Sequence, residues 1–368
     1  MTTGPVGVAL VGAGKISGEY LRNLSAFPDV RVLGVADLDT ARAAEVAREW
    51  DVPIGGDVET VLALPEVEIV VNLTIPAAHA DVAITALRAG KHVYGEKPLA
   101  LTPDEGREVL GEAGMRGLRV GSAPDTFLGA GLQSAARALA DGVIGTPVAA
   151  TAVMQNPGPE SWHPNPEFLY QRGAGPLFDI GPYYLTALTA MLGPVSKVAA
   201  TARQAKARRV IGSGPKGGTE FTVEVPTHVM ALIDFTAGPS ASSTFSFDSS
   251  ARVTMIQITG TEGTLSLPDP NTFGGPLRVR SAKDDDWRDL PVEGASAGRG
   301  LGVLDMARAL RADLPHRATG LLGLHVLEAM TAIAESAERG EFRRIESAAP
   351  VPEPLPVDWD PYEATLQV

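Results

Sequence analysis

Residues 6–17 read Val6-Gly-Val-Ala-Leu-Val-Gly-Ala-Gly-Lys-Ile-Ser17, and they predict how the N-terminal part of the chain folds. Its apolar run Val6–Val11 predicts a buried strand, and the spacing of apolar residues over Ile16–Leu24 predicts a helix directly after it. Gly12 permits the tight turn between them. Gly14 lets a pyrophosphate approach the backbone at the helix N-terminus. The predicted dinucleotide site comprises Gly12, Gly14, Lys15 and Ile16; a plain glycine turn is the alternative.

The pattern continues as an alternation of short apolar runs with helical segments. Such alternation is typical of a parallel sheet with helices on both faces. We therefore predict a doubly wound Rossmann domain over residues 1–123. Its further strands are expected at Val30–Ala36, Glu68–Leu73, Lys91–Tyr94 and Leu118–Ser122, and its further helices at Thr40–Trp50, Ala77–Ala89 and Pro103–Met115, with Thr40 as an N-cap.

The rhythm changes after residue 123, which predicts a second, α/β domain over residues 124–348. Residues 194–290 alternate polar and apolar side chains. This alternation is typical of an antiparallel or mixed sheet with one face exposed to solvent or to a partner. The proline-containing segment Asn156–Tyr170 predicts a loop, and Pro176–Leu192 predicts a helix interrupted at Gly181-Pro182. Residues 349–368 are rich in proline and predict an extended tail.

Composition excludes several classes of protein. The chain has no cysteine, which excludes disulfides, thiol catalysis and cysteine-based metal sites. No apolar run reaches 18 residues and the N-terminus reads as a strand, so we expect no membrane partner and a cytoplasmic protein. The net charge of −13 argues against nucleic acid as a partner. The histidines show no ligand spacing, and we predict no metal site.

Asp37 is the acidic residue at the end of the second predicted strand. A carboxylate there accepts hydrogen bonds from both ribose hydroxyls of the adenosine and repels a 2′-phosphate. We therefore expect NAD as the cofactor in preference to NADP. The alternative is a turn residue that caps the next helix.

Three further stretches point to one family. They read Asn72-Leu-Thr-Ile-Pro-Ala-Ala-His79, Gly90-Lys-His-Val-Tyr-Gly-Glu-Lys-Pro98 and Gly173-Ala-Gly-Pro-Leu-Phe-Asp-Ile-Gly-Pro-Tyr-Tyr184. With the N-terminal glycines, they resemble the glucose–fructose oxidoreductase / inositol dehydrogenase / MocA family. The resemblance implies a Rossmann domain followed by an α/β domain with a large open, mostly antiparallel sheet. It also implies oligomer contacts through that sheet, hence a homodimer or homotetramer.

The resemblance also implies roles for single residues. Lys97 of the Glu-Lys-Pro triplet would lie beside nicotinamide and substrate, where an ammonium stabilises developing alkoxide charge; the alternative is a surface bridge to Glu96. Further cofactor contacts would come from Thr74, Pro76, His79, Glu96 and Pro98. For His79, capping the helix that begins there is the alternative.

The second catalytic motif of many members is Asp-x-Gly-x-His, and here Tyr183 stands in place of the histidine after Asp179. The two residues share one helix face because they are four apart. A free tyrosine titrates near pH 10, so Tyr183 needs a cation such as Lys97 to act as the base. Asp179 would orient the tyrosine or bind a sugar hydroxyl. The alternative for Tyr183 is core packing, which we expect for its neighbour Tyr184.

Polar and aromatic residues before this helix are candidates for substrate contacts. Trp162 would stack on a sugar face, while His163 or Asn165 would bind hydroxyl groups. Arg172 would bind a substrate oxygen. Anchoring of the loop is the alternative.

Together these patterns predict an NAD(H)-dependent oxidoreductase acting on a secondary alcohol or ketone of a sugar, inositol or related polyol. Two alternatives keep the fold. One is an enzyme that cleaves glycosides while recycling its NAD; the other is a regulator that binds NAD without catalysis.

Overall fold

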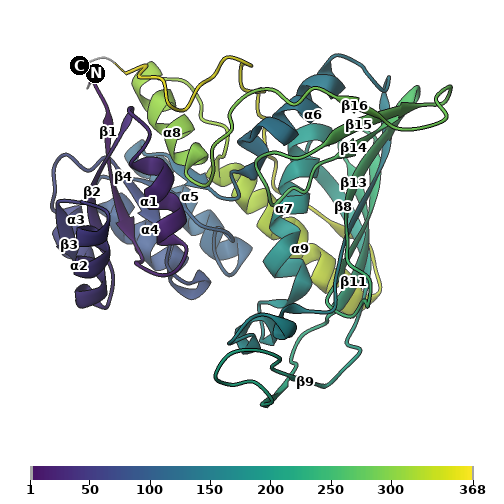
Figure 1. The fold of residues 1–368 in the computed structure, drawn as a ribbon, viewed down its shortest axis with the longest axis horizontal. Helices are drawn as coiled ribbons and strands as arrows, with labels where there is room; N and C mark the ends of the chain where they lie inside the picture. Colours follow the sequence, from purple (N-terminus) through teal and green to yellow (C-terminus); the bar gives the residue numbers. More distant parts are fainter. Residues whose placement is uncertain (1–2, 367–368) are drawn as a thin grey trace. The chain divides into compact units, whose positions relative to one another are not determined.

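The computed structural model describes residues 3–366, and contacts along the chain divide it into two compact units (Figure 1). The first unit comprises the residues up to Gln133, Glu293–Leu327 and the chain from Pro352 onward. The second comprises Ser134–Val292 and Glu328–Val351. The return of 293–327 and of the tail to the first unit is not apparent from the sequence. The boundaries at 123 and 348 stay a prediction.

The first unit contains the doubly wound parallel sheet that the sequence predicted. Its six strands lie in the order β3-β2-β1-β4-β5-β6, and every neighbouring pair is parallel. Its elements are β1 (Val6–Val11), α1 (Ser17–Leu24), β2 (Val30–Ala36), α2 (Thr40–Glu49), β3 (Ile54–Gly56), α3 (Val58–Leu62), β4 (Ile69–Asn72), η1 (Pro76–Ala78), α4 (His79–Arg88), β5 (His92–Gly95), α5 (Pro103–Arg116), β6 (Val120–Ser122), η2 (Thr126–Leu128) and α8 (Leu301–Ala312). Strand β1 is buried along its whole length, as its apolar run requires.

Three details of this unit differ from the prediction. Strand β3 and helix α3 were not predicted. Helix α2 is capped by the Asp39 side chain, which accepts from the Arg42 N–H at 3.1 Å, so Thr40 is the first helical residue instead of the cap. Helix α4 begins at His79 after a short 3-10 turn.

The second unit is built on a nine-stranded mixed sheet, which confirms the large, mostly antiparallel sheet. Its order is β16-β15-β14-β13-β7-β12-β11-β8-β17, and only β7 and β12 pair in parallel. The elements are β7 (Pro147–Gln155), η3 (Pro159–Ser161), η4 (Glu167–Tyr170), α7 (Gly175–Leu192), β8 (Val195–Arg203), β9 (Arg208–Val210), β10 (Glu220–Thr222), β11 (His228–Phe235), β12 (Ser240–Ser246), β13 (Val253–Gly260), β14 (Gly263–Leu267), β15 (Leu277–Ser281), β16 (Arg288–Leu290) and β17 (Arg343–Arg344). Helices α6 (Ala130–Ala140) and α9 (Gly320–Arg339) each run from one unit into the other.

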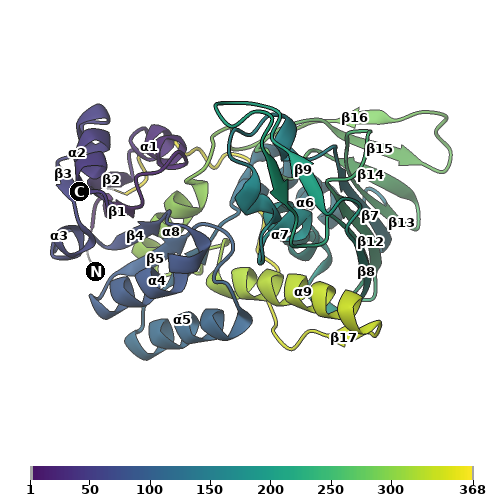
Figure 2. The same ribbon diagram turned by 90° about the horizontal axis from the view of Figure 1, so that it is seen from below.

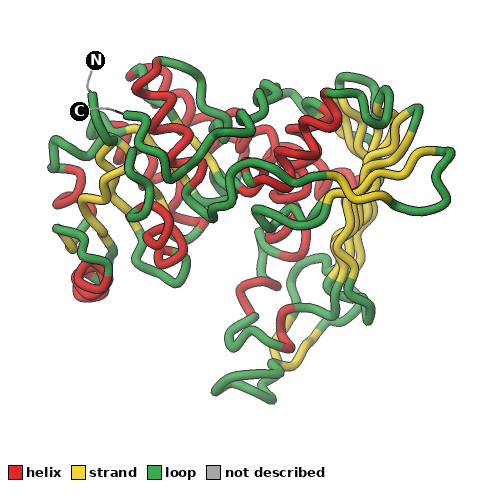
Figure 3. Tube along the Cα trace, turned by 45° about the horizontal axis from the view of Figure 1, so that its top comes forward, coloured by secondary structure: helices red, strands yellow, loops and turns green. Residues whose placement is uncertain are grey.

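Helix α7 packs on one face of this sheet, against β12, β11 and β7 (Figure 2). It is continuous through Pro182, so the predicted interruption is wrong. The segment Asn156–Tyr170 is a loop with two short 3-10 turns. Strands β9 and β10 form a separate hairpin (Figure 3), and the glycine-rich residues 212–218 lie in the segment that joins them.

The tail is held in the first unit by Asp29, which lies at the start of β2 and is fully buried. Its carboxylate accepts hydrogen bonds from the Thr365 hydroxyl at 2.7 Å, from the Leu366 N–H at 2.9 Å and from Arg308 Nε at 2.8 Å. Arg308 also lies over the ring of Trp359, 4.7 Å from its centroid.

Within residues 3–366 no helix is long and apolar enough to cross a bilayer. The cytoplasmic location stays a prediction.

Candidate active site

The glycine loop after β1 has the geometry of a phosphate cradle. Gly12 has a φ of +107°, and a Cβ at this position would lie 2.6 Å from the carbonyl oxygen of Leu73. A side chain is therefore excluded where the loop passes the end of β4. At Gly14, by contrast, a Cβ would meet nothing within 4 Å. Open space at Gly14 and the N-terminus of α1, which has no side-chain cap, fit a bound pyrophosphate.

Asp37 is fixed against this loop. One carboxylate oxygen accepts from the Ala13 N–H at 2.8 Å and the other from the Asp39 N–H at 2.9 Å. The cap of α2 is Asp39, so Asp37 is not the capping residue of that helix. Its half-buried carboxylate lies at the carboxyl end of β2 and bonds the glycine loop, which fits a dinucleotide whose ribose lies at this edge of the sheet.

The Glu-Lys-Pro segment after β5 is held by buried partners. Glu96 accepts from the Tyr20 hydroxyl at 2.8 Å and from the Lys97 N–H at 3.0 Å. His79 is 2% exposed, and its two ring nitrogens lie 2.6 Å from the carbonyl oxygen of Pro98 and 3.0 Å from that of Thr74. His79 therefore links the loop after β4 to the Lys97–Pro98 segment.

The loop after β4 is itself ordered by Asn72. Its side-chain oxygen accepts from the Thr74 hydroxyl at 2.7 Å, and its amide donates to the His79 carbonyl at 2.9 Å. Pro76 opens the short 3-10 turn that leads into α4. The predicted cofactor residues of the first unit thus follow the carboxyl ends of four parallel strands, β1, β2, β4 and β5, which form the usual ligand-binding edge of such a sheet.

Helix α7 carries the second motif. Tyr183 is 5% exposed and Asp179 is half-buried. The Tyr184 hydroxyl donates to the Val153 carbonyl at 3.5 Å, and its ring packs edge-on against Phe245. Burial, followed by the nearby Asp269 carboxylate, raises the pKa of Tyr184, so this phenol is a core group and a poor base.

A cavity of about 180 Å³ lies in the second unit beside the start of α7. Its polar lining combines side chains of four segments that are distant in sequence, together with the indole of Trp162. These groups are Asn156, Asp179, Tyr184, Thr254, Asp269 and Asn271, and Tyr183 is not among the lining residues. Drug-sized ligands occupy roughly 300–1,000 Å³, so this cavity suits a single small ring.

The other predicted substrate residues do not line this cavity. His163 packs edge-on against Trp162 and Phe168, with ring centroids 5.5 Å apart in both pairs. Asn165 is exposed and donates its N–H to His163 Nδ1 at 3.0 Å, while Arg172 is exposed on the turn before α7. Their roles toward a substrate stay predictions. Sequence patterns gave no signal for Asn156, Asp269 or Asn271.

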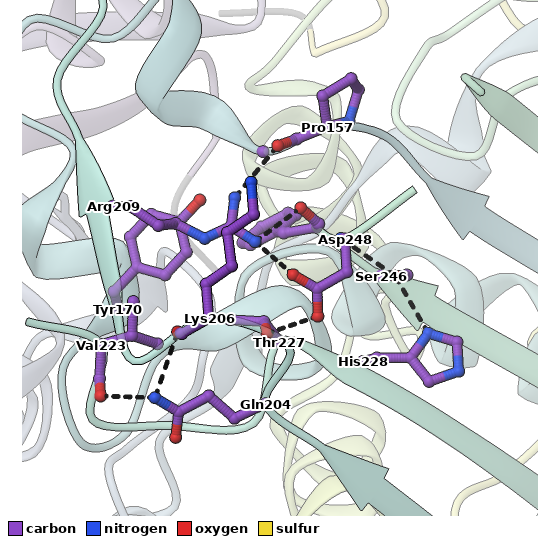
Figure 4. A network of polar contacts seen from close by, with 12 residues as sticks. Pro157, Tyr170, Gln204, Lys206, Arg209, Val223, Thr227, His228, Ser246 and Asp248 are labelled. Atoms are coloured by element: carbon purple, nitrogen blue, oxygen red, sulfur yellow. Dashed lines mark hydrogen bonds and ion pairs between the residues drawn. The ribbon is translucent and has the colours of Figure 1, made fainter. Parts of the chain in front are cut away.

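A buried polar network, which we call the Arg209 network, bonds the segments that carry the cavity-lining residues Pro159 and Phe247 (part of it is drawn in Figure 4). Arg209 is 4% exposed and donates to the carbonyl oxygens of Pro157 at 3.0 Å and Phe247 at 2.9 Å. It pairs with the carboxylates of Glu160 and Asp248. The network comprises Arg209, Glu160, Asp248 and Tyr170, whose hydroxyl donates to Glu160.

The network reaches the cavity through the backbone. Phe247 and Pro159 line the cavity. Arg209 donates to the Phe247 carbonyl, and it also bonds Pro157 and Glu160, which lie two residues before and one residue after Pro159. Gly158 has a φ of +105°, and a Cβ there would lie 2.3 Å from a Glu160 oxygen and 2.6 Å from Arg209. A glycine is therefore required where the loop crosses the network.

Two family models match the chain. The model of an oxidoreductase family with an NAD-binding Rossmann fold matches residues 6–123, and the GFO/IDH/MocA C-terminal domain matches residues 132–266. Together they cover more than half of the chain.

Named relatives and a solved structure are similar over most of their length. The chain is 27% identical to trans-1,2-dihydrobenzene-1,2-diol dehydrogenase of Sus scrofa, over 82% of this chain and 86% of the relative. It is 28% identical to 1,5-anhydro-D-fructose reductase of Ensifer adhaerens, over 92% and 98%. The crystal structure of an NAD binding oxidoreductase from Klebsiella pneumoniae has the same fold, with a TM-score of 0.81, 24% identity and coverage of 93% and 99%. The chain belongs to the GFO/IDH/MocA family and is an NAD-binding oxidoreductase.

Proposed function

We propose that this protein is an NAD(H)-dependent dehydrogenase or ketoreductase that acts on a secondary alcohol or ketone of a sugar, inositol or related polyol. The observation that carries the proposal is the cavity beside α7. It combines the motif residue Asp179 with two amides, a hydroxyl group and the indole of Trp162. Amides and carboxylates bind vicinal hydroxyl groups, and an aromatic face covers the C–H side of a sugar ring.

The cofactor preference follows from Asp37. Its carboxylate is held by two backbone N–H groups at the edge of the sheet where the adenosine ribose is expected. A 2′-phosphate there would meet a fixed negative charge. We infer a preference for NAD over NADP.

Lys97, Tyr183 and Asp179 are the proposed catalytic groups. When bound, the nicotinamide accepts or supplies the hydride. Tyr183 takes the proton of the substrate hydroxyl in oxidation and returns it in reduction. The Lys97 ammonium stabilises the developing alkoxide. Asp179 holds a second hydroxyl group of the ring.

Tyr183 is preferred because it occupies the histidine position of the family motif, and because burial raises the pKa of Tyr184 and makes that phenol a poor base. Glu96 is occupied by Tyr20 and by the Lys97 N–H. It therefore acts on the backbone of the Glu-Lys-Pro segment.

We also propose a homodimer or homotetramer formed through the sheet face opposite α7. Side chains on that face alternate with the buried ones, and Met230 and Leu232 on β11 are 48% and 59% exposed. Exposed apolar side chains on a broad sheet face favour a protein partner. Sedimentation velocity of the wild-type protein and of a Leu232→Lys variant tests this; a monomeric wild-type protein contradicts it.

The experiment for the proposed activity has two steps. NADH fluorescence titration measures cofactor binding, and absorbance at 340 nm then follows NADH formation with inositols, aldoses, anhydrosugars and glycosides. NADH formation with one of these supports the proposal and identifies the substrate class. Cofactor binding without net NADH, but with cleaved glycoside, indicates NAD recycling. Cofactor binding with no product at all indicates a regulator.

A further inference from the structure

The cavity beside α7 is lined by negative charge. Asp179 and Asp269 contribute two carboxylates, and the other polar lining groups are the neutral side chains of Asn156, Trp162, Tyr184, Thr254 and Asn271. Among the lining residues, all of which fall within 3–366, none is Lys, Arg or His. His163, which follows Trp162 in sequence, and the exposed Arg252, two residues before Thr254, are not part of the lining.

The layer behind the wall does not reverse this charge. The guanidinium of Arg209 lies behind Phe247, but it is paired with both Glu160 and Asp248. One cation and two carboxylates leave this layer with a net negative charge when all three are ionised.

Asp269 is held in place at the rim of the cavity. In the turn between β14 and β15, one oxygen of its carboxylate accepts from the Asn271 N–H at 2.9 Å, and its carbonyl oxygen accepts from the Thr272 hydroxyl at 2.8 Å. The field of this carboxylate contributes, after burial, to the raised pKa of Tyr184. Asp269, which is itself exposed, and Tyr184 of α7 both line the cavity.

We propose that Asp269 is a specificity-determining residue that makes this cavity select uncharged or amino-bearing polyols and reject sugars that carry a phosphate or carboxylate group. This inference rests on the proposed function, and it concerns the part of the substrate away from the reacting carbon. A like charge within about 6 Å, at a dielectric between those of protein and water, costs about tenfold in affinity. An ammonium group gains attraction from the carboxylates and from the faces of Trp162 and Phe247.

The test compares matched ligands. Glucose, glucosamine, glucuronate and glucose 6-phosphate form one set; myo-inositol, an aminoinositol and myo-inositol phosphate form the other. Binding to the NADH-loaded protein is measured by calorimetry, and kcat/KM is measured for every ligand that reacts. We expect neutral and amino ligands to be preferred over their anionic partners by tenfold or more, and the preference to weaken at high salt.

Two variants assign the effect. Asp269→Asn should reduce the neutral-to-anionic ratio about tenfold. Asp285→Asn, which removes the same charge from an exposed loop outside the cavity, should leave the ratio unchanged. Any of three results overturns the inference. An anionic ligand binds as well as its neutral partner, the Asp269→Asn protein keeps the wild-type ratio, or neither set of ligands binds. Selective binding without turnover supports it and counts against the proposed dehydrogenase activity instead.

Discussion

Replacement of Arg209 by methionine is the sharpest test of how the cavity wall is held. Arg209→Met keeps most of the side-chain volume but leaves Glu160 and Asp248 unpaired, with side chains only 14% and 10% exposed. It also removes the donors to the carbonyl groups of Pro157 and Phe247. Removing one partner of a buried ion pair costs about 3–5 kcal/mol. In a unit of this size, that lowers the melting temperature by roughly 6–20 °C.

The neighbouring residue supplies the control. Arg208 is on the same strand and pairs with Glu220, but these side chains are 67% and 52% exposed. An exposed pair contributes about 0–1 kcal/mol, so Arg208→Met should unfold almost like the wild type. Both variants are compared by urea and thermal unfolding followed by circular dichroism.

A third variant separates charge from packing. In Arg209→Met/Glu160→Gln/Asp248→Asn no buried charge is left uncompensated, so most of the lost stability should return. Substrate KM should stay raised in this variant, because the backbone at Pro157 and Phe247 is still untethered, while the KM for NAD stays unchanged. An Arg209→Met protein within about 1 kcal/mol of the wild type would refute the reasoning.

Three further predictions concern single side chains. Tyr183→Phe should lower kcat by about 10²–10⁴-fold with NADH binding intact, whereas Tyr184→Phe should change kcat little; equal losses in steady-state assays would contradict the assignment. Asp37→Asn keeps an acceptor for the Ala13 N–H but removes the charge, so the NAD-to-NADP ratio of kcat/KM should fall at least tenfold, and an unchanged ratio would exclude the proposed role. Burial alone raises the pKa of Asp29, but the bonds from Leu366, Thr365 and Arg308 outweigh it and lower that pKa below its usual value. Its stabilising effect is therefore complete above about pH 4, the unfolded value, and is lost as pH falls through the lower folded pKa. In urea unfolding, the stability difference between wild type and Asp29→Asn should shrink on acidification below about pH 4; a difference that is independent of pH would disprove this.

The strongly periodic part of the fold could be predicted from the sequence. Strand β1 is a continuous apolar run, helix α1 has apolar residues at helical spacing, and the glycine loop between them marks the turn. Strand β3 has three residues, two of them glycine, which is too short for a period of two to be visible. Gly55 is explained only by packing, because a Cβ there would lie 2.6 Å from the Cα of Ala44.

Helix α7 shows the opposite error. Gly181 and Pro182 predict a break by local propensity, but the helix continues through both. Gly181 faces α9, where a Cβ would make an ordinary contact of 3.5 Å with the Met330 sulfur, so α7 packs against α9 within the second unit at this point. Tertiary packing here outweighs the local preference.

Some residues of the candidate site could be proposed from the sequence and others could not. Residues in short motifs, such as Gly12, Lys97 and Asp179, could be proposed from the sequence because each motif carries several chemical constraints within a few positions. Asp269 and Arg209 could not, since each acts on segments that only the folded sheet brings near. No local pattern distinguishes such an aspartate or arginine from those on the surface.

The contacts of the buried Asp29 carboxylate also determine when the first unit can complete its folding during synthesis. The unit that begins the chain contains β1 and the glycine loop, yet it also contains α8 and the tail that Asp29 binds. Those segments are translated only after the whole of residues 134–292. Domains usually fold in the order in which they leave the ribosome. In this protein the nucleotide-binding sheet stays incompletely covered until α8 and the tail have been synthesised. A chaperone that shields the sheet would therefore act mainly during the synthesis of residues 134–292.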